Sequence, residues 1–99
     1  MKRIAVDDLP TEPLAAAGVF HQHWLDHVET VLAKGEDVLI TLPPADYTHR
    51  EWRRAAVAML ARQYTPLRVN VVSGEGRGLD KAEAYLSGAP GITGQYLET

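Results

Sequence analysis

Short apolar segments alternate with helix-like segments along the whole of this chain. The apolar segments predict four β-strands, at residues 2–6, 37–42, 67–72 and 92–97. The run Val38-Leu39-Ile40 does not alternate with polar residues, which is typical of a strand covered on both faces in a parallel sheet. Long connections separate the strands, so the order βαβαβαβ predicts a mostly parallel four-stranded sheet with right-handed crossovers.

Two long helices are predicted from apolar side chains that recur every three or four residues. The first spans residues 19–34 and ends at Gly35, a residue that favours a left-handed C-cap. The second runs to about Tyr64 and begins at the capping box Thr48-His49-Arg50-Glu51, or with Asp46 as the alternative cap. Its arginines are predicted to form a basic edge that faces solvent; they are Arg50, Arg53, Arg54 and Arg62.

A short third helix and an irregular connector complete the expected fold. Asp80 and Glu83 predict a helix cap after the glycine-rich turn 73–78, and the helix ends near Gly88. In the connector 9–18, two prolines argue against one regular helix; they are Pro10 and Pro13. The chain is therefore predicted to be a single, small α/β domain with three layers and about three helices.

Composition excludes several functional classes. The net charge is −3 and no basic run occurs, which disfavours nucleic-acid binding. No apolar run approaches the roughly 18 residues of a membrane span. The chain has no cysteine, which excludes disulfides, thiolate metal sites and a cysteine nucleophile. No long apolar stretch follows the basic residues at the start, so the cytoplasm is the expected location.

Two segments in the second half resemble the short-chain dehydrogenase/reductase family. Residues 52–70, WRRAAVAMLARQYTPLRVN, are similar to that family's last large helix and the strand after it. Residues 85–97, YLSGAPGITGQYL, are similar to its C-terminal short helix, turn and final strand. Residues 19–34 and 37–42 resemble the preceding helix and strand more weakly. The resemblance implies the C-terminal half of a Rossmann-like fold, over about residues 19–99.

The residues with which that family binds its coenzyme and performs catalysis do not match. The family holds a dinucleotide on a glycine-rich turn after its first strand, whereas residues 7–12 carry three acids and no glycine. The family's Tyr-x-x-x-Lys pair corresponds to Asp46 and Arg50, or, with a one-residue gap, to Tyr47 and Glu51. We therefore predict no cofactor and no catalytic residue.

Polar residues after the second and third strands form the candidate ligand site. They support an alternative function, that of a small-molecule or nucleotide-binding protein with a residual dehydrogenase-like site at the carboxyl edge of the strands. The glycine-rich turn lies where a phosphate could bind, although its Glu75 favours a plain flexible connector. His23 and His27 are one helical turn apart, but no third ligand is evident, so no metal is predicted. The candidate ligand-site residues are Asp46, Tyr47, His49, Ser73, Gly74, Gly76 and Arg77.

Large apolar residues on the two long helices predict self-association. In the resembled family these helices form a four-helix bundle between subunits, and a chain this short covers a four-stranded sheet poorly on its own. The main prediction is a non-catalytic interaction module that forms a homodimer or pairs with a full-length dehydrogenase homologue. A hydrophobic core is the alternative interpretation of the same residues. The interface candidates are Phe20, Trp24, Val28, Val31, Trp52, Ala56, Met59 and Leu60.

Overall fold

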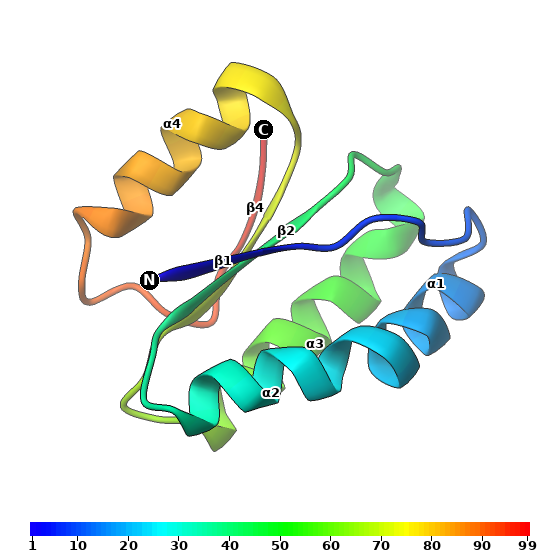
Figure 1. Ribbon diagram of the computed structural model, residues 1–99. Coiled ribbons are helices and arrows are strands. Elements are labelled where there is room, and N and C mark those ends of the chain that lie inside the picture. The colour runs from blue at the N-terminus through cyan, green and yellow to red at the C-terminus, as the bar shows by residue number, and fades with distance from the viewer.

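Four parallel strands form one sheet in a computed structural model that describes residues 1–99. Their order across the sheet is β1-β2-β3-β4. α1, α2 and α3 lie on one side of the sheet and α4 on the other, so the predicted three-layer α/β fold is confirmed (Figure 1). The strands are β1 (Lys2–Ala5), β2 (Val38–Leu42), β3 (Val69–Ser73) and β4 (Tyr96–Glu98).

The first helical segment begins earlier than predicted. α1 (Pro13–Val19) continues through a π-helical turn, η1 (Phe20–Trp24), into α2 (Leu25–Ala33). No single regular helix spans residues 9–18, as the prolines predicted, but α1 begins at Pro13, because a proline in the first helical turn lacks only an N–H that has no partner in the helix. The end is as predicted, since Gly35 has a φ of +86°. None of the helices combines the length and apolar character that crossing a bilayer requires.

Caps position the other two helices. Asp46, rather than Thr48, caps the second long helix: a 3-10 turn, η2 (Tyr47–His49), leads into α3 (Arg50–Gln63). The Asp46 carboxylate accepts the backbone N–H of Thr48 at 2.9 Å, so the alternative cap is confirmed and the capping box is not formed. α4 (Gly76–Ser87) begins four residues before Asp80, which corrects the predicted cap. The glycine turn allows this early start, because Gly76 adopts a φ of +63°.

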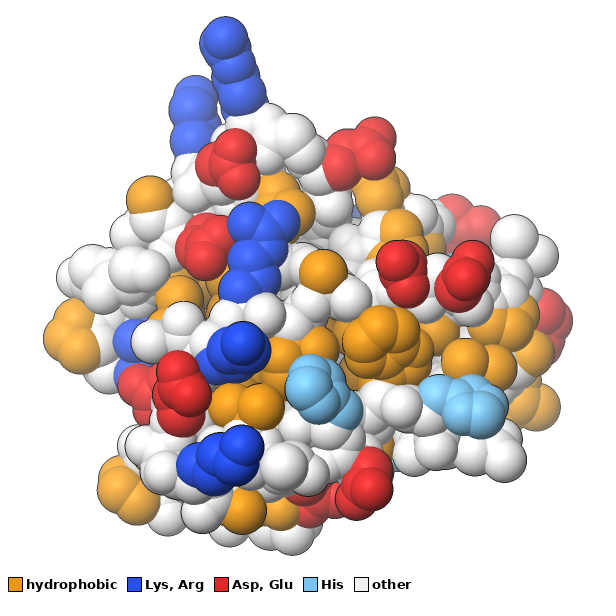
Figure 2. All heavy atoms as spheres, viewed as in Figure 1, with side chains coloured by type: hydrophobic (Ala, Val, Ile, Leu, Met, Phe, Trp, Pro, Cys, Tyr) orange, Lys and Arg blue, Asp and Glu red, His pale blue; other side chains and the backbone are white.

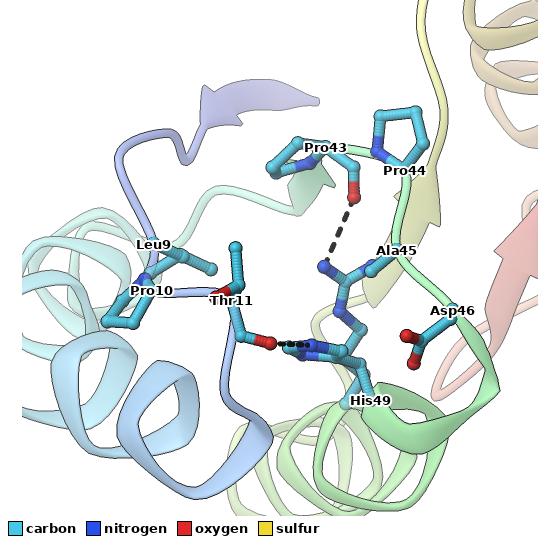
Figure 3. Close-up of a pocket in the computed structure, with 9 residues that line it drawn as sticks. Leu9, Pro10, Thr11, Pro43, Pro44, Ala45, Asp46 and His49 are labelled. Carbon is cyan, nitrogen blue, oxygen red and sulfur yellow. Dashed lines mark hydrogen bonds between the residues drawn. The ribbon is translucent and has the colours of Figure 1, made fainter.

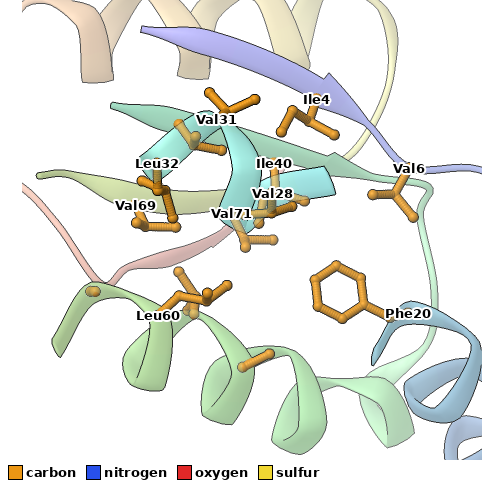
Figure 4. Close-up of a cluster of buried hydrophobic side chains, with 14 of the residues drawn as sticks. Ile4, Val6, Phe20, Val28, Val31, Leu32, Ile40, Leu60, Val69 and Val71 are labelled. Carbon is orange, nitrogen blue, oxygen red and sulfur yellow. The ribbon is translucent and has the colours of Figure 1, made fainter. Parts of the chain in front are cut away.

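Side chains of the sheet alternate between two hydrophobic clusters. The larger cluster has 15 buried residues and fills the space between the sheet and α1, α2 and α3 (Figure 4). Its members from the central strands include Ile40 and Val71. The smaller cluster joins Leu39 and Val72, on the opposite face, to Leu79 and Leu86 of α4. This face of the sheet is therefore covered by α4.

The last crossover has the opposite hand to the first two. All three connections step in the same direction across the sheet, but α4 lies on the opposite face from α2 and α3 (Figure 1). Two connections between parallel strands have opposite hands when they step across the sheet in the same direction but pass over opposite faces of it. The two connections on the shared face follow the strong right-handed rule, so the prediction of right-handed crossovers is wrong for β3–α4–β4.

The segment after α4 returns to the sheet by bonding to the start of β3. The Arg68 guanidinium donates to the carbonyls of Leu86 at 2.6 Å, Ala89 at 3.0 Å and Ile92 at 2.9 Å. The Asn70 side chain also donates to Ile92 and accepts the N–H of Gln95, both at 3.0 Å. These bonds hold residues 92–95 as a loop, which explains why β4 is shorter than the predicted strand. They also join the two segments that carry the family resemblance.

Candidate functional site

A cavity of about 280 Å³ lies at the carboxyl ends of β1 and β2. Two loops form most of it: residues 9–11, which follow β1, and residues 43–46, which follow β2 (Figure 3). His49 from η2 and Arg53 from α3 complete the lining. Open parallel sheets bind ligands at this edge, so the cavity is the primary candidate site.

Asp46 places a negative charge on the lining of the cavity. Its carboxylate accepts the hydroxyl of Thr48 as well as the Thr48 backbone N–H. The hydroxyl bond, followed by the backbone bond, lowers the pKa of Asp46 below its usual value. Asp46 is therefore ionised at neutral pH.

His49 ties the loop after β1 to α3. It is 5% exposed, with its Nε2 atom 3.0 Å from the Thr11 carbonyl and its Nδ1 atom 3.2 Å from the Trp52 indole nitrogen. A carbonyl can only accept and an indole N–H can only donate, so the proton resides on Nε2. Both ring nitrogens are occupied, and His49 acts as a structural bridge in this wall.

Arg53 is buried rather than part of a solvent-facing basic edge, which corrects the sequence prediction. It is 2% exposed and is the largest fully buried side chain of the chain. One nitrogen, Nη1, donates to the Ser73 hydroxyl at 3.0 Å and to the Tyr96 hydroxyl at 3.2 Å. The other, Nη2, donates to the Pro43 carbonyl at 3.1 Å, the bond drawn from Pro43 in Figure 3. Arg53 thus joins the carboxyl ends of β2 and β3 to Tyr96, the first residue of β4, beneath the cavity.

Helical periodicity could have placed Arg53 inside. It precedes Ala56, Val57 and Leu60 by three, four and seven residues, and all three are buried. Residues at these spacings share one face of a helix. The charge of the side chain led to the opposite prediction, because an arginine is almost never fully buried unless it has partners.

The candidate ligand-site residues are divided between two places. Asp46 and His49 line the cavity, and Ser73 contacts it through Arg53 and Pro43, both of which line it. Tyr47 is 74% exposed and does not line it. The glycine-rich turn lies at the start of α4, where β4 ends; its candidates are Gly74, Gly76 and Arg77.

Thr99 packs into the glycine-rich turn. Its backbone N–H and its hydroxyl donate to the Ser73 carbonyl, at 2.9 and 3.1 Å. A Cβ atom on Gly74 would lie 1.8 Å from the Thr99 hydroxyl oxygen, and one on Gly78 would lie 3.1 Å from it. The glycines therefore permit the close approach of the chain's own last residue, at the position where the sequence suggested a phosphate.

Replacing Gly74 by alanine is expected to lower the free energy of unfolding by about 2–4 kcal/mol. The new Cβ atom would collide with the Thr99 side chain, and the φ of +151° at this position strains any residue other than glycine. Gly18→Ala is the matched control, since Gly18 is helical, has no positive φ, and has open space for 4 Å around the point that a Cβ atom would occupy. This control is expected to stabilise the protein by about 0.5–1 kcal/mol. Urea unfolding measures both variants, and equal effects would contradict this assignment.

The positions that correspond to the family's Tyr-x-x-x-Lys pair have other partners. Arg50 donates from Nε to the Glu98 carboxylate at 2.9 Å, and this contact lowers the pKa of Glu98 and raises that of Arg50. Tyr47 and Glu51 are both exposed, and neither lines the cavity. Arg50 therefore links α3 to β4 at the surface.

Five of the eight interface candidates pack inside the subunit. Trp24 and Trp52 are partly buried, and Met59 is 56% exposed. Two grooves flank the outer side of α3: one of about 250 Å³ against η1 and α2, and one of about 430 Å³ against α1. The candidates inside the core are Phe20, Val28, Val31, Ala56 and Leu60.

A tyrosine bonds to Glu29, one of the residues that line the groove between α2 and α3. The hydroxyl of Tyr64, the residue after α3, donates to the carboxylate of Glu29 in α2. This bond, followed by partial desolvation, raises the pKa of Tyr64 above its ordinary value of 10.0. Because the folded pKa is raised, the stabilisation is present below the ordinary pKa and is lost as the pH rises through the folded pKa.

Tyr64→Phe is expected to remove the tyrosine ionisation that occurs at the highest pH in an ultraviolet absorbance titration. The variant leaves three tyrosines with no Glu29 bond. Tyr85→Phe is the control, since it removes an exposed phenol and is expected to leave that last ionisation in place. Loss of the same step in both variants would contradict the Tyr64–Glu29 bond.

The histidines of the first helical segment are exposed. The Nδ1 atom of His21 lies 2.7 Å from the Ala17 carbonyl, which is an ordinary bond within a helix. His23 and His27 have no bonding partner in the subunit. No group of three or more histidine, aspartate or glutamate side chains with metal-binding geometry occurs in the chain.

A protein-family model matches nearly the whole chain. The model described as "SDR-like: Short chain dehydrogenase-like protein" matches residues 4–99. This match extends the resemblance toward the start of the chain, to include the second half of β1 and all of α1. Searches of curated proteins and of solved structures gave no significant match.

Proposed function

The chain belongs to the short-chain dehydrogenase-like family, and on that premise we propose that it is a non-catalytic interaction module that forms a homodimer through α1, α2 and α3. The absence of cysteine is compatible with the reducing cytoplasm, where we place this role. The outward side of α3 is the observation that carries the proposal.

Small and apolar residues are exposed on the outward side of α3, between the two grooves. Ala55, Ala58 and Met59 all lie there. The grooves beside them are lined by Leu14 of α1, which is 80% exposed, and by Leu25 of α2. Figure 2 shows hydrophobic side chains that also reach the surface beside histidines over the α1–α2 segment. Small residues on a helix allow a second helix to approach closely, and burying the apolar side chains favours association.

The charges on this side of α3 are complementary to those of a second, antiparallel copy. If a twofold axis passes midway between Ala55 and Ala58, each alanine faces the other residue on the second copy. The same axis places Glu51 of one copy opposite Arg62 of the other, twice. Both side chains are exposed and form no ion pair within the subunit. A second copy of this surface is therefore complementary to α3 in both shape and charge.

Several features support a non-catalytic role. The cavity is smaller than the usual 300–1,000 Å³ of ligand sites and cannot hold a dinucleotide. Arg50, at the position of the family's lysine, is paired with Glu98. The glycine-rich turn is packed against Thr99. Each of these sites is occupied by the chain's own residues or is too small for a coenzyme.

Charge reversal tests the proposed pairing of α3 with α3. Arg62→Glu and Glu51→Arg are each expected to weaken dimerisation by about tenfold, because each places like charges opposite one another twice. The double variant Glu51→Arg/Arg62→Glu is expected to restore the wild-type dissociation constant, because it exchanges the two partners. Sedimentation equilibrium measures all four proteins.

A charge reversal on α4, away from the proposed interface, is the control. Lys81→Glu reverses an exposed charge on the opposite face of the sheet and is expected to leave dimerisation unchanged. A wild-type monomer at micromolar concentration, or a double variant no stronger than either single variant, would contradict the proposal. Pairing with a full-length homologue instead would give a wild-type monomer that copurifies with a dehydrogenase.

A further inference from the structure

The hydrogen bonds of Arg53 occupy only part of its guanidinium group. The acceptors on Nη1 and Nη2, the Ser73 hydroxyl and the Pro43 carbonyl, lie 3.4 Å from each other. Two acceptors this close lie together at the edge between Nη1 and Nη2. The Tyr96 hydroxyl takes the remaining proton of Nη1. An arginine has five N–H donors in a fixed plane, so the unoccupied edge is the one that joins Nε to Nη2.

This unoccupied edge is unusual because it is buried. The Arg53 Nε atom is the one buried side-chain nitrogen or oxygen of the chain without a hydrogen-bond partner. Every acceptor that Arg53 does contact is a neutral group, and no carboxylate lies within ion-pair distance. A buried cation without a counter-charge is costly, and buried charges in proteins are normally paired.

The cavity at the strand ends provides space for an anion next to Arg53. Five of its nine lining residues have apolar side chains; they are Leu9, Pro10, Pro43, Pro44 and Ala45. Its volume of about 280 Å³ suits a molecule of only a few heavy atoms. His49 has both nitrogens bonded within the protein, which leaves Arg53 as the cationic group of the lining.

We propose that this cavity binds a short aliphatic monocarboxylate, whose two oxygens accept from Nε and Nη2 of Arg53. Bidentate pairing of this kind is a frequent and strong arginine–carboxylate geometry, and it supplies the missing counter-charge. The hydrocarbon part lies against the prolines and Leu9. The ionised Asp46 on the lining repels a second negative charge, which excludes dicarboxylates and phosphate.

Binding displaces side chains that now enclose the Nε atom. Arg53 is 2% exposed, so the carboxylate reaches it only when the loop of residues 9–11 moves. His49 holds that loop through Thr11 and is therefore expected to respond to the ligand. The cost of this movement places the expected dissociation constant in about the millimolar range.

Propionate is the probe, and two-dimensional NMR of the full chain is the readout. Propionate is expected to cause saturable shifts of the amide signals of residues 9–11 and 45–49 and of the Arg53 Nε–H signal. Propionamide, its neutral isostere, and inorganic phosphate are the matched controls and are expected to cause no saturable shift. Equal binding of propionamide, or shifts that grow with propionate without saturating, would overturn the proposal.

Two variants test the roles of the charged residues. Arg53→Lys keeps the positive charge but lacks the planar pair of donors, and it is expected to weaken propionate binding by at least about tenfold. Asp46→Asn retains a capping side chain and is exposed, so it folds even where the Arg53 variant does not. This variant is expected to admit succinate, which the wild type rejects. Unchanged rejection of succinate by Asp46→Asn, or unchanged propionate affinity of a folded Arg53→Lys protein, would count against the site.

Discussion

Replacing Phe20 by alanine is expected to lower the free energy of unfolding by about 3–5 kcal/mol. Phe20 is 2% exposed and lies where α1 passes into the π-helical turn. Its ring packs against Trp52 of α3, with a distance of 5.6 Å between ring centres, and belongs to the larger hydrophobic cluster. Truncation leaves a cavity between the helices and the sheet that neighbouring side chains fill only in part. A domain of this size is stable by only about 5–15 kcal/mol, so a large part of its stability depends on this ring.

Urea unfolding at equilibrium measures this loss. Tyr85→Ala is the matched control, because it removes an aromatic ring that is 59% exposed on α4. The control is expected to change the free energy of unfolding by no more than about 0.5 kcal/mol. Equal losses in the two variants would show that the core between α1, α3 and the sheet is not packed as described.

Arg68→Met is expected to lower the free energy of unfolding by about 2–4 kcal/mol. Methionine keeps much of the aliphatic stem but donates no hydrogen bonds, so the carbonyls of Leu86, Ala89 and Ile92 lose their shared partner. These carbonyls hold the segment that connects α4 to β4. Hydrogen exchange of the amides in residues 92–99 is therefore expected to accelerate more than exchange in β2.

Arg77→Met provides the comparison for this variant. Arg77 lies on the exposed side of α4 and forms no ion pair or side-chain hydrogen bond. Its replacement is expected to have an effect within about 0.5 kcal/mol. If Arg68→Met is no more destabilised than Arg77→Met, the bonds between Arg68 and the α4–β4 segment do not fix the last crossover.

Local patterns predicted the sheet and most of the helices. The run at residues 38–40 is a strand buried on both faces, and its neighbours are parallel. Gly35 ends the first long helix, and residue 63 is the last of α3. These features depend on the conformational preferences of neighbouring residues, which can be inferred from the sequence alone. The helix that begins at Pro13 was not predicted, because the same residue that breaks a helix interior is favoured at the first turn.

Features that depend on distant residues were not predictable in this way. The left-handed crossover is accompanied by bonds from Arg68 and Asn70 to Ile92, which is 24 and 22 residues away, and no local preference encodes such contacts. The packing of Thr99 on Gly74 likewise joins two ends of neighbouring strands. The general rule of right-handed connections was therefore the best available prediction, and it failed at one of three crossovers.

The sequence predicted where the candidate site lies, but it did not predict the central residue of the site, Arg53. Asp46 and His49 were expected at the carboxyl edge of the strands, and both line the cavity there. The burial of Arg53 was not predicted, because the charge of its side chain favours solvent although its helical spacing places it on the buried face. A buried arginine on an apolar stripe is uncommon, and it identifies the part of the site that the family resemblance does not describe.

The distance between two identical positions in the dimer tests the proposed interface most directly. The chain has no cysteine, so Gln63→Cys and Lys81→Cys each provide a single site for a nitroxide spin label, at an exposed position away from the facing alanines. Double electron–electron resonance then detects only distances between subunits. We predict a dipolar signal from both labels, with a clearly shorter distance at residue 63 of α3 than at residue 81 of α4. No dipolar signal from residue 63, or a shorter distance at residue 81, would contradict the assembly of two copies through α3.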